Sequence, residues 1–127
     1  MTQELMHPAL DAAHAVVIAA YDATRFLAEL DLGGLVGRLR RTASAANQAT
    51  LRGCKEVQQA GGRAVPQGVH ALERAAELLR ELADCVEGAR RRGLDLGAAM
   101  EVLEYQAHAS LTLAALLEHL GAVARAA

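Results

Sequence analysis

Aromatic residues are scarce in this chain, and their scarcity constrains both the core and the function. Only 2% of the 127 residues are aromatic, with no tryptophan, one phenylalanine and two tyrosines, whereas 53% are hydrophobic. The core must therefore be built mainly from alanine, leucine and valine, which favours closely packed helices. Strand-forming residues are few and alternating apolar and polar runs are absent, which argues against a sheet. The chain also offers almost no rings on which nucleic-acid bases could stack.

Cysteine and net charge are low as well. Cys54 and Cys85 are the only two cysteines and form no Cys-x-x-Cys pair, so we expect reduced thiols in a cytoplasmic protein. The formal net charge of -2 provides no overall attraction to nucleic acids or acidic membranes. Any such binding must therefore depend on a local patch of charge.

No targeting or membrane segment is expected from the sequence. The N-terminal MTQELMHPAL contains no basic segment followed by an apolar one, so it does not have the pattern of a signal peptide. The longest apolar run is AVVIAAY from Ala15, far shorter than the roughly 18 residues that a membrane span requires.

Glycine and proline divide the chain into four segments with helical periodicity. We expect helices from about Pro8 to Glu29 or Leu30, from Leu35 toward Ala60, from Pro66 to Arg92, and from an N-cap at Asp95 to about Val123. The short connections between them imply antiparallel neighbours. The sequence therefore predicts an all-α fold, with residues 1–127 forming a single up-down-up-down four-helix bundle.

The second segment is an amphipathic helix with an unusual share of arginine. At 100° per residue, one side carries Leu35, Leu39, Ala43, Ala46, Thr50, Cys54 and Val57. The opposite side carries a basic stripe, which consists of Arg38, Arg41, Arg52 and Lys55. The glycines of GGLVGRLRRTASAANQATLRG, residues 33–53, lack the spacing of a phosphate-binding loop, and no strand precedes them.

The third segment carries an acidic stripe, which consists of Glu73, Glu77, Glu81, Asp84 and Glu87. Two interpretations of the stripes remain open. The acidic and basic stripes could pair with each other, within the bundle or between subunits. Alternatively, the basic stripe could bind the phosphates of RNA or DNA, with strong salt dependence and little sequence preference.

The fourth segment is apolar around most of its circumference. Its first apolar stripe, which we expect to face the bundle core, consists of Leu96, Met100, Leu103, Ala107, Leu111 and Ala114. Its second apolar stripe consists of Val102, Tyr105, Ala109, Leu113, Leu116 and Leu120. A helix of this kind requires burial on two sides, so we expect a homo-oligomer with the second stripe at the interface. The alternative is a helix that lies more centrally within one bundle.

No residue pattern predicts catalysis, a metal or a cofactor. A di-metal bundle uses Glu-x-x-His pairs on two helices, whereas Glu104 and His108 are one residue too far apart and His70 precedes Glu73. We expect His14 to be a core or boundary histidine. The serines and cysteines have no recognisable activating partner, so we do not expect an enzyme.

The chain resembles the bacterial four-helix-bundle family that includes proteins encoded in intervening sequences of 23S ribosomal RNA genes. The resemblance rests on Tyr21, Thr24, Asp31, Gly34, Leu35, Leu39, Arg40, Arg41 and Gly53, and on Leu79, Glu81, Leu82, Ala89 and Gly93 further along. The chain departs from the family pattern at Leu27-Ala28, where Phe-Pro is usual, at Ala49, where Asn is usual, and at Arg52, where Glu is usual. Contacts that depend on that Asn and Glu therefore do not transfer.

The resemblance implies a ring of five subunits, in agreement with the oligomer expected from the fourth helix. One branch of the family comprises the accessory variability proteins of diversity-generating retroelements, which bind a reverse transcriptase and its RNA through a basic surface. By this resemblance we expect a non-catalytic oligomeric adaptor with Arg38, Arg41, Arg52 and Lys55 as its contacts. The rival is an oligomeric interaction scaffold that binds no nucleic acid because its arginines pair with the acidic stripe.

Overall fold

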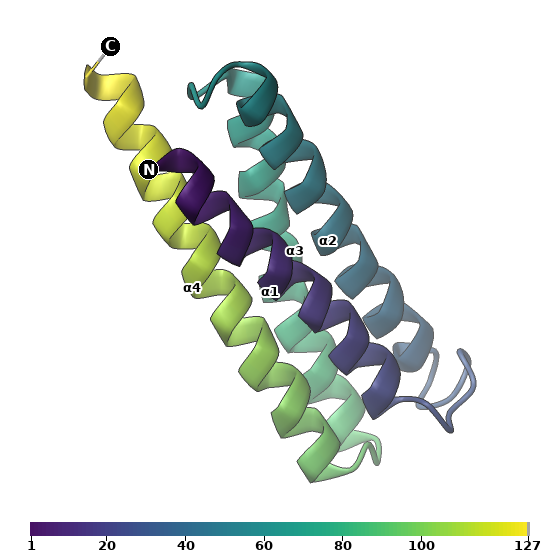
Figure 1. Cartoon of the computed structure of the whole chain (residues 1–127). Coiled ribbons are helices and arrows are strands. Elements are labelled where there is room, and N and C mark those ends of the chain that lie inside the picture. The colour runs from purple at the N-terminus through teal and green to yellow at the C-terminus, as the bar shows by residue number, and fades with distance from the viewer. Residues whose placement is uncertain (127) are drawn as a thin grey trace.

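The computed structural model describes residues 1–126, which form four helices and no strand. The helices are α1 (Thr2–Ala23), α2 (Leu35–Gln59), α3 (Pro66–Arg91) and α4 (Leu96–Ala126). Successive helices run in opposite directions, so both termini lie at the end that also holds the α2–α3 connection (Figure 1). Each helix packs against its two neighbours around the bundle. The prediction of an all-α four-helix bundle is confirmed.

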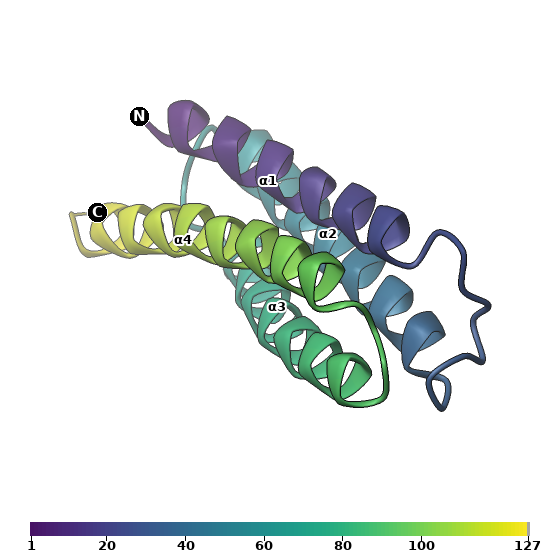
Figure 2. The ribbon, with the colours of Figure 1, turned by 90° about the horizontal axis from the view of Figure 1, so that it is seen from below.

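The core is built from small and branched aliphatic side chains, as the composition predicts. α1 packs most extensively with α4, and α2 with α3, so that two helix pairs face each other (Figures 1 and 2). Leucine and valine from α2, α3 and α4 fill the centre, whereas the buried face of α1 is largely alanine. Alanine allows the α1 backbone to lie close to its neighbours, which compensates for the absence of large aromatic rings.

The predicted limits of α1 are wrong at both ends. The helix begins at Thr2, six residues before Pro8, because Met6 is buried in the core and the Thr2 hydroxyl lies 2.8 Å from Nε2 of His119. It ends at Ala23, after which the backbone forms turns in which the Leu27 amide donates to the Thr24 carbonyl at 2.9 Å. The limits of the other helices agree with the prediction to within three residues.

The expectation that His14 is a core or boundary histidine is also wrong. His14 is exposed, as is Tyr21, whereas Ala12, Ala13 and Val16 are buried. The many alanines of this helix give little contrast between its faces, so helical periodicity alone did not fix its orientation.

The closest approach between α2 and α3 occurs where glycine faces glycine. A Cβ atom added at Gly53 would lie 2.6 Å from Cγ of Leu72 and 2.9 Å from the carbonyl oxygen of Gly68. Both distances are shorter than van der Waals contact, and the Gly68 backbone cannot move without shifting α3. Gly53 therefore fixes the spacing of the two helices.

We expect Gly53→Ala to lower the free energy of unfolding by about 1–2 kcal/mol, because the overpacking cost exceeds the higher helix propensity of alanine. Urea denaturation measures the change. Gly121→Ala is the matched control, since its new methyl group would meet only the mobile end of Arg125 at 3.3 Å. That control should be stabilised by up to about 1 kcal/mol. Equal effects of the two substitutions would contradict the close approach.

Candidate nucleic-acid interface

The basic stripe lies on the side of α2 that faces solvent. Arg38, Arg41, Arg52 and Lys55 are all exposed, and the stripe covers about 26 Å of helix at 1.5 Å per residue. No carboxylate of residues 1–126 forms an ion pair or side-chain hydrogen bond with any of the four. The four cations are therefore accessible to a ligand.

Arg40 differs from the stripe because its side chain is bound within the fold. Its guanidinium donates to the Thr24 hydroxyl at 2.9 Å, to the Thr24 carbonyl at 2.6 Å and to the Leu27 carbonyl at 3.2 Å. It also lies over the Tyr21 ring, 5.2 Å from the ring centre. These contacts tie α2 to the end of α1, so Arg40 acts in structure and not in ligand binding.

Three of the five residues of the acidic stripe pair with arginines of α3 itself. Nη1 of Arg74 lies 3.1 Å from Glu77 and 3.4 Å from Glu81, and Nη2 of Arg90 lies 3.1 Å from Glu87. The hydrogen bond to Glu77 is the main cause of a raised pKa of Arg74. The interpretation that the basic and acidic stripes pair within one bundle is therefore wrong for the part of the chain that the structure describes.

The small net charge hides an uneven distribution over the helices. α1 and α4 carry six acidic residues, Glu4, Asp11, Asp22, Glu101, Glu104 and Glu118, against a single arginine, Arg125. α2 carries five basic residues and one acid, Glu56. The molecule thus has a basic side along α2 and an acidic side along α1 and α4, which a net charge of -2 does not reveal.

The two apolar stripes of α4 have exchanged the positions that we expected. The second stripe, predicted to form the oligomer interface, lies in the monomer core: Val102, Ala109, Leu113, Leu116 and Leu120 are buried, and only Tyr105 is exposed. The first stripe, predicted to face the core, points outward: Leu96, Met100, Ala107, Leu111 and Ala114 are exposed, and Leu103 is half-buried. Five of the six predicted interface residues therefore cannot contact a partner, because α1 and α3 already cover them.

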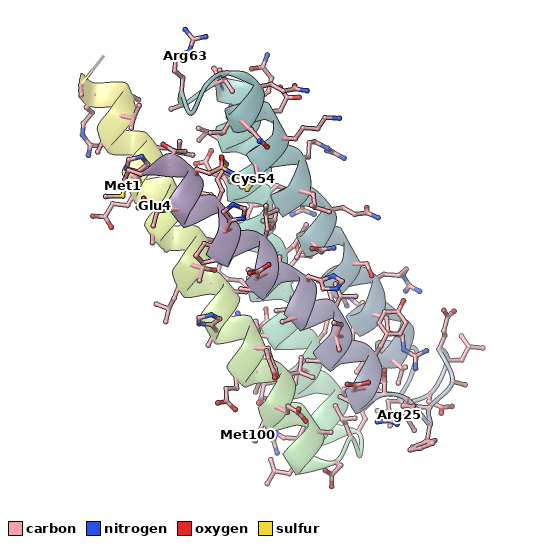
Figure 3. All side chains as sticks on the ribbon, viewed as in Figure 1. Met1, Glu4, Arg25, Cys54, Arg63 and Met100 are labelled. Atoms are coloured by element: carbon pink, nitrogen blue, oxygen red, sulfur yellow. The ribbon has the colours of Figure 1, made fainter. Side chains whose placement is uncertain are left out.

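The outward face of α4 is the most apolar surface of the described chain. Leu111 is 71% exposed, and Met100 lies on the side of the helix that faces away from the bundle (Figure 3). α4 is also long and apolar enough to cross a membrane, and only 22% of its most apolar window is buried. We expected no segment long and apolar enough to cross a membrane, and α4 departs from this expectation by its length and composition. A core helix can also have this length and composition.

A second exposed apolar feature was missed because we expected helix there. The α1–α2 connection presents Phe26, which is 92% exposed, and Leu30, which is 85% exposed. The Arg25 guanidinium lies 5.4 Å from the centre of the Phe26 ring. The adjacent Gly33-Gly34, both with positive φ, is the signal of a turn, but the helical spacing of Thr24 and Leu27 suggested continuation.

The surface formed by residues 1–126 has shallow, open hollows. One of them, of about 530 Å³, is lined by Glu101, Glu104, Tyr105 and His108 on the acidic side of α4. Within residues 1–126, no three histidine, cysteine or carboxylate side chains converge on a point that could hold a metal ion. Both cysteines are buried and unpaired, and burial raises the pKa of the Cys54 thiol to about 11, so it is not a nucleophile at neutral pH.

Comparison with protein families, curated proteins and solved structures finds no match to this chain. The resemblance to the intervening-sequence family therefore stays a prediction. The structure does give a physical role to several residues on which it rests: Tyr21 and Thr24 both contact Arg40, and Gly53 permits the close approach of α2 and α3. The pattern thus marks positions that hold the bundle together.

Proposed function

We propose that this protein is a non-catalytic, cytoplasmic adaptor that binds structured RNA through the basic stripe of α2. The observation that carries the proposal is the exposure of four cations along one side of one helix, with no carboxylate partner among the described residues. When such a stripe neutralises RNA phosphates, the counterions condensed on the RNA are released with a gain in entropy. Since almost no aromatic side chains accompany the stripe, it is suited to the backbone of RNA and not to its bases.

The resemblance to the accessory proteins of diversity-generating retroelements supports a reverse transcriptase as a second partner. Such a partner would meet the same basic stripe, directly or through the RNA that it carries. This part of the proposal rests on the resemblance alone.

The proposed adaptor is a homo-oligomer assembled through the first stripe of α4. An apolar face that runs along a helix about 46 Å long is costly to leave in water, and a second copy of the chain would cover it. The resemblance implies a ring of five subunits. The rival function, an interaction scaffold without nucleic-acid binding, is favoured by the acidic side formed by α1 and α4.

RNA binding at several salt concentrations tests the proposed function. If all four cations contact phosphates, the logarithm of the binding constant should fall with the logarithm of the salt concentration with a slope of about -3. The double variant Arg38→Glu, Arg41→Glu should weaken binding at least tenfold and reduce the magnitude of the slope by about half. Native mass spectrometry in the same buffers should show an unchanged oligomer.

Arg80→Glu together with Arg91→Glu is the matched control, because it changes the net charge equally at two exposed positions of α3, outside both α2 and α4. This control should bind RNA nearly as tightly as the parent protein. Absence of binding by the parent protein at low salt would refute the RNA function and leave the scaffold. Equal losses in the two double variants would show that overall charge, and not the stripe, governs binding.

A further inference from the structure

A closed ring requires two different surfaces on each subunit, because every contact in it is head-to-tail. The inference developed here rests on the ring proposed above. The first stripe of α4 supplies one surface, and its convex shape suits a groove on the neighbouring copy. Another part of the fold must supply that groove.

The surface between α1 and α2 has the required shape and chemistry. A shallow hollow of about 410 Å³ lies there, which we call the α1/α2 groove; it is lined by Leu10, Leu51, Arg52, Cys54, Lys55 and Gln58. Leu51 is 51% exposed, although it lies in the middle of α2. The groove therefore combines apolar side chains with two basic residues of α2.

The charges on the two surfaces are complementary. The outward side of α4 carries Glu104 and Glu118 beside the apolar residues, and neither has an ion-pair partner within residues 1–126. On α2, Lys55 lies about 40° around the helix from Leu51, so its ammonium group borders the groove. An acidic, apolar helix thus faces a basic, apolar groove.

The other exposed faces fit α4 less well. The outer face of α3 carries charges of both signs that already pair with one another, such as Arg74 with Glu77 and Glu81. Arg38 and Arg41 lie about 140° and 80° around α2 from Leu51, on a surface without large apolar side chains.

We propose that α4 of one copy docks in the α1/α2 groove of the next copy. Leu111 and Met100 pack against Leu51 and Leu10, and Glu104 or Glu118 pairs with Lys55. The arrangement divides the basic stripe: Arg52 and Lys55, which line the groove, lie at the subunit junction, whereas Arg38 and Arg41 stay exposed. RNA binding and assembly can therefore occur together, with Arg38 and Arg41 providing the phosphate contacts.

Two complementary variants test the junction. The groove variant, Leu51→Glu with Lys55→Glu, places acids opposite the α4 carboxylates. The face variant, Leu111→Lys with Glu104→Lys, places cations opposite Lys55. All four positions are exposed in the monomer, so both variants should keep the circular dichroism spectrum of the parent protein. Native mass spectrometry should show each variant alone as a monomer.

Mixing the two variants provides the decisive measurement. The groove variant keeps an intact α4 face and the face variant keeps an intact groove, so an equimolar mixture should form heterodimers. Because the two altered surfaces carry opposite charges, larger assemblies that contain the two variants in equal numbers would support the junction as well. A groove variant that assembles like the parent protein would overturn the proposal, since direct α4-to-α4 pairing does not use the groove. A mixture that stays monomeric would overturn it as well.

The measurements distinguish a protein that forms no ring from a ring whose subunits are joined through other surfaces. A parent protein that is monomeric, whether or not it floats with phosphatidylcholine vesicles, would refute both the ring and the proposed junction. A parent ring that survives in the groove variant would refute only the junction. The RNA measurement with Arg38→Glu, Arg41→Glu is independent of either outcome.

Discussion

Replacing Leu113 with alanine should lower the free energy of unfolding by about 3–5 kcal/mol, the range found when a fully packed leucine is truncated and its neighbours cannot close the cavity. Leu113 is 2% exposed and belongs to the continuous core formed by all four helices. It is also one of the residues that the sequence assigned to the oligomer interface. A loss of this size would show that the second stripe of α4 holds the monomer together.

Leu111→Ala, two residues earlier on the same helix, is the matched control. Leu111 is 71% exposed, so its truncation should change the stability of the monomer by no more than about 0.5 kcal/mol. Urea denaturation at several protein concentrations separates the two effects. A core cavity lowers the midpoint at every concentration, whereas a weakened interface lowers it only at concentrations at which the parent protein is oligomeric. A larger loss from Leu111→Ala in dilute monomer would contradict the observed orientation of α4.

The contrast between α2 and α4 shows why only part of the fold could be predicted. α2 has apolar residues on one side and charged residues on the other, so periodicity placed Leu39, Ala43 and Val57 correctly in the core. α4 is apolar on both candidate sides, and periodicity cannot choose between them. The choice depends on where α1 and α3 lie, which is a property of the whole bundle.

The exposure of the basic stripe could be predicted from the sequence, but the absence of ion pairs with its side chains could not. Helical spacing put Arg38, Arg41, Arg52 and Lys55 on the exposed side, and the structure agrees. Whether these side chains met the acidic stripe depended on the local preference of the α3 glutamates for Arg74 and Arg90, three or more residues away on the same helix. The sequence is equally compatible with ion pairs inside α3 and with ion pairs between the two stripes, since the acidic residues of α3 have basic residues nearby in both cases.

Arg40→Ala is expected to destabilise the fold by about 2–4 kcal/mol, because it removes three charge-assisted hydrogen bonds and leaves the Leu27 carbonyl of the α1–α2 connection without this donor, whereas the Thr24 carbonyl keeps the hydrogen bond from the Leu27 amide. The loss of the stacking contact with Tyr21 adds to the effect. Arg40→Lys should recover only part of it, since one ammonium group cannot reproduce the fork that reaches both Thr24 and Leu27.

Arg41→Ala provides the control, because Arg41 is exposed and its side chain forms no ion pair or hydrogen bond among the described residues. Its stability should stay within about 0.5 kcal/mol of the parent protein. Hydrogen exchange should also show faster exchange of the amides of residues 24–34 in Arg40→Ala alone, because the Arg40 contacts order that connection. Equal losses in the two variants would contradict the structural role assigned to the Arg40 contacts. A loss confined to Arg40→Ala would mean that Arg40 stabilises the fold, whereas the adjacent Arg41 stays free on the surface, as the proposed phosphate contact requires.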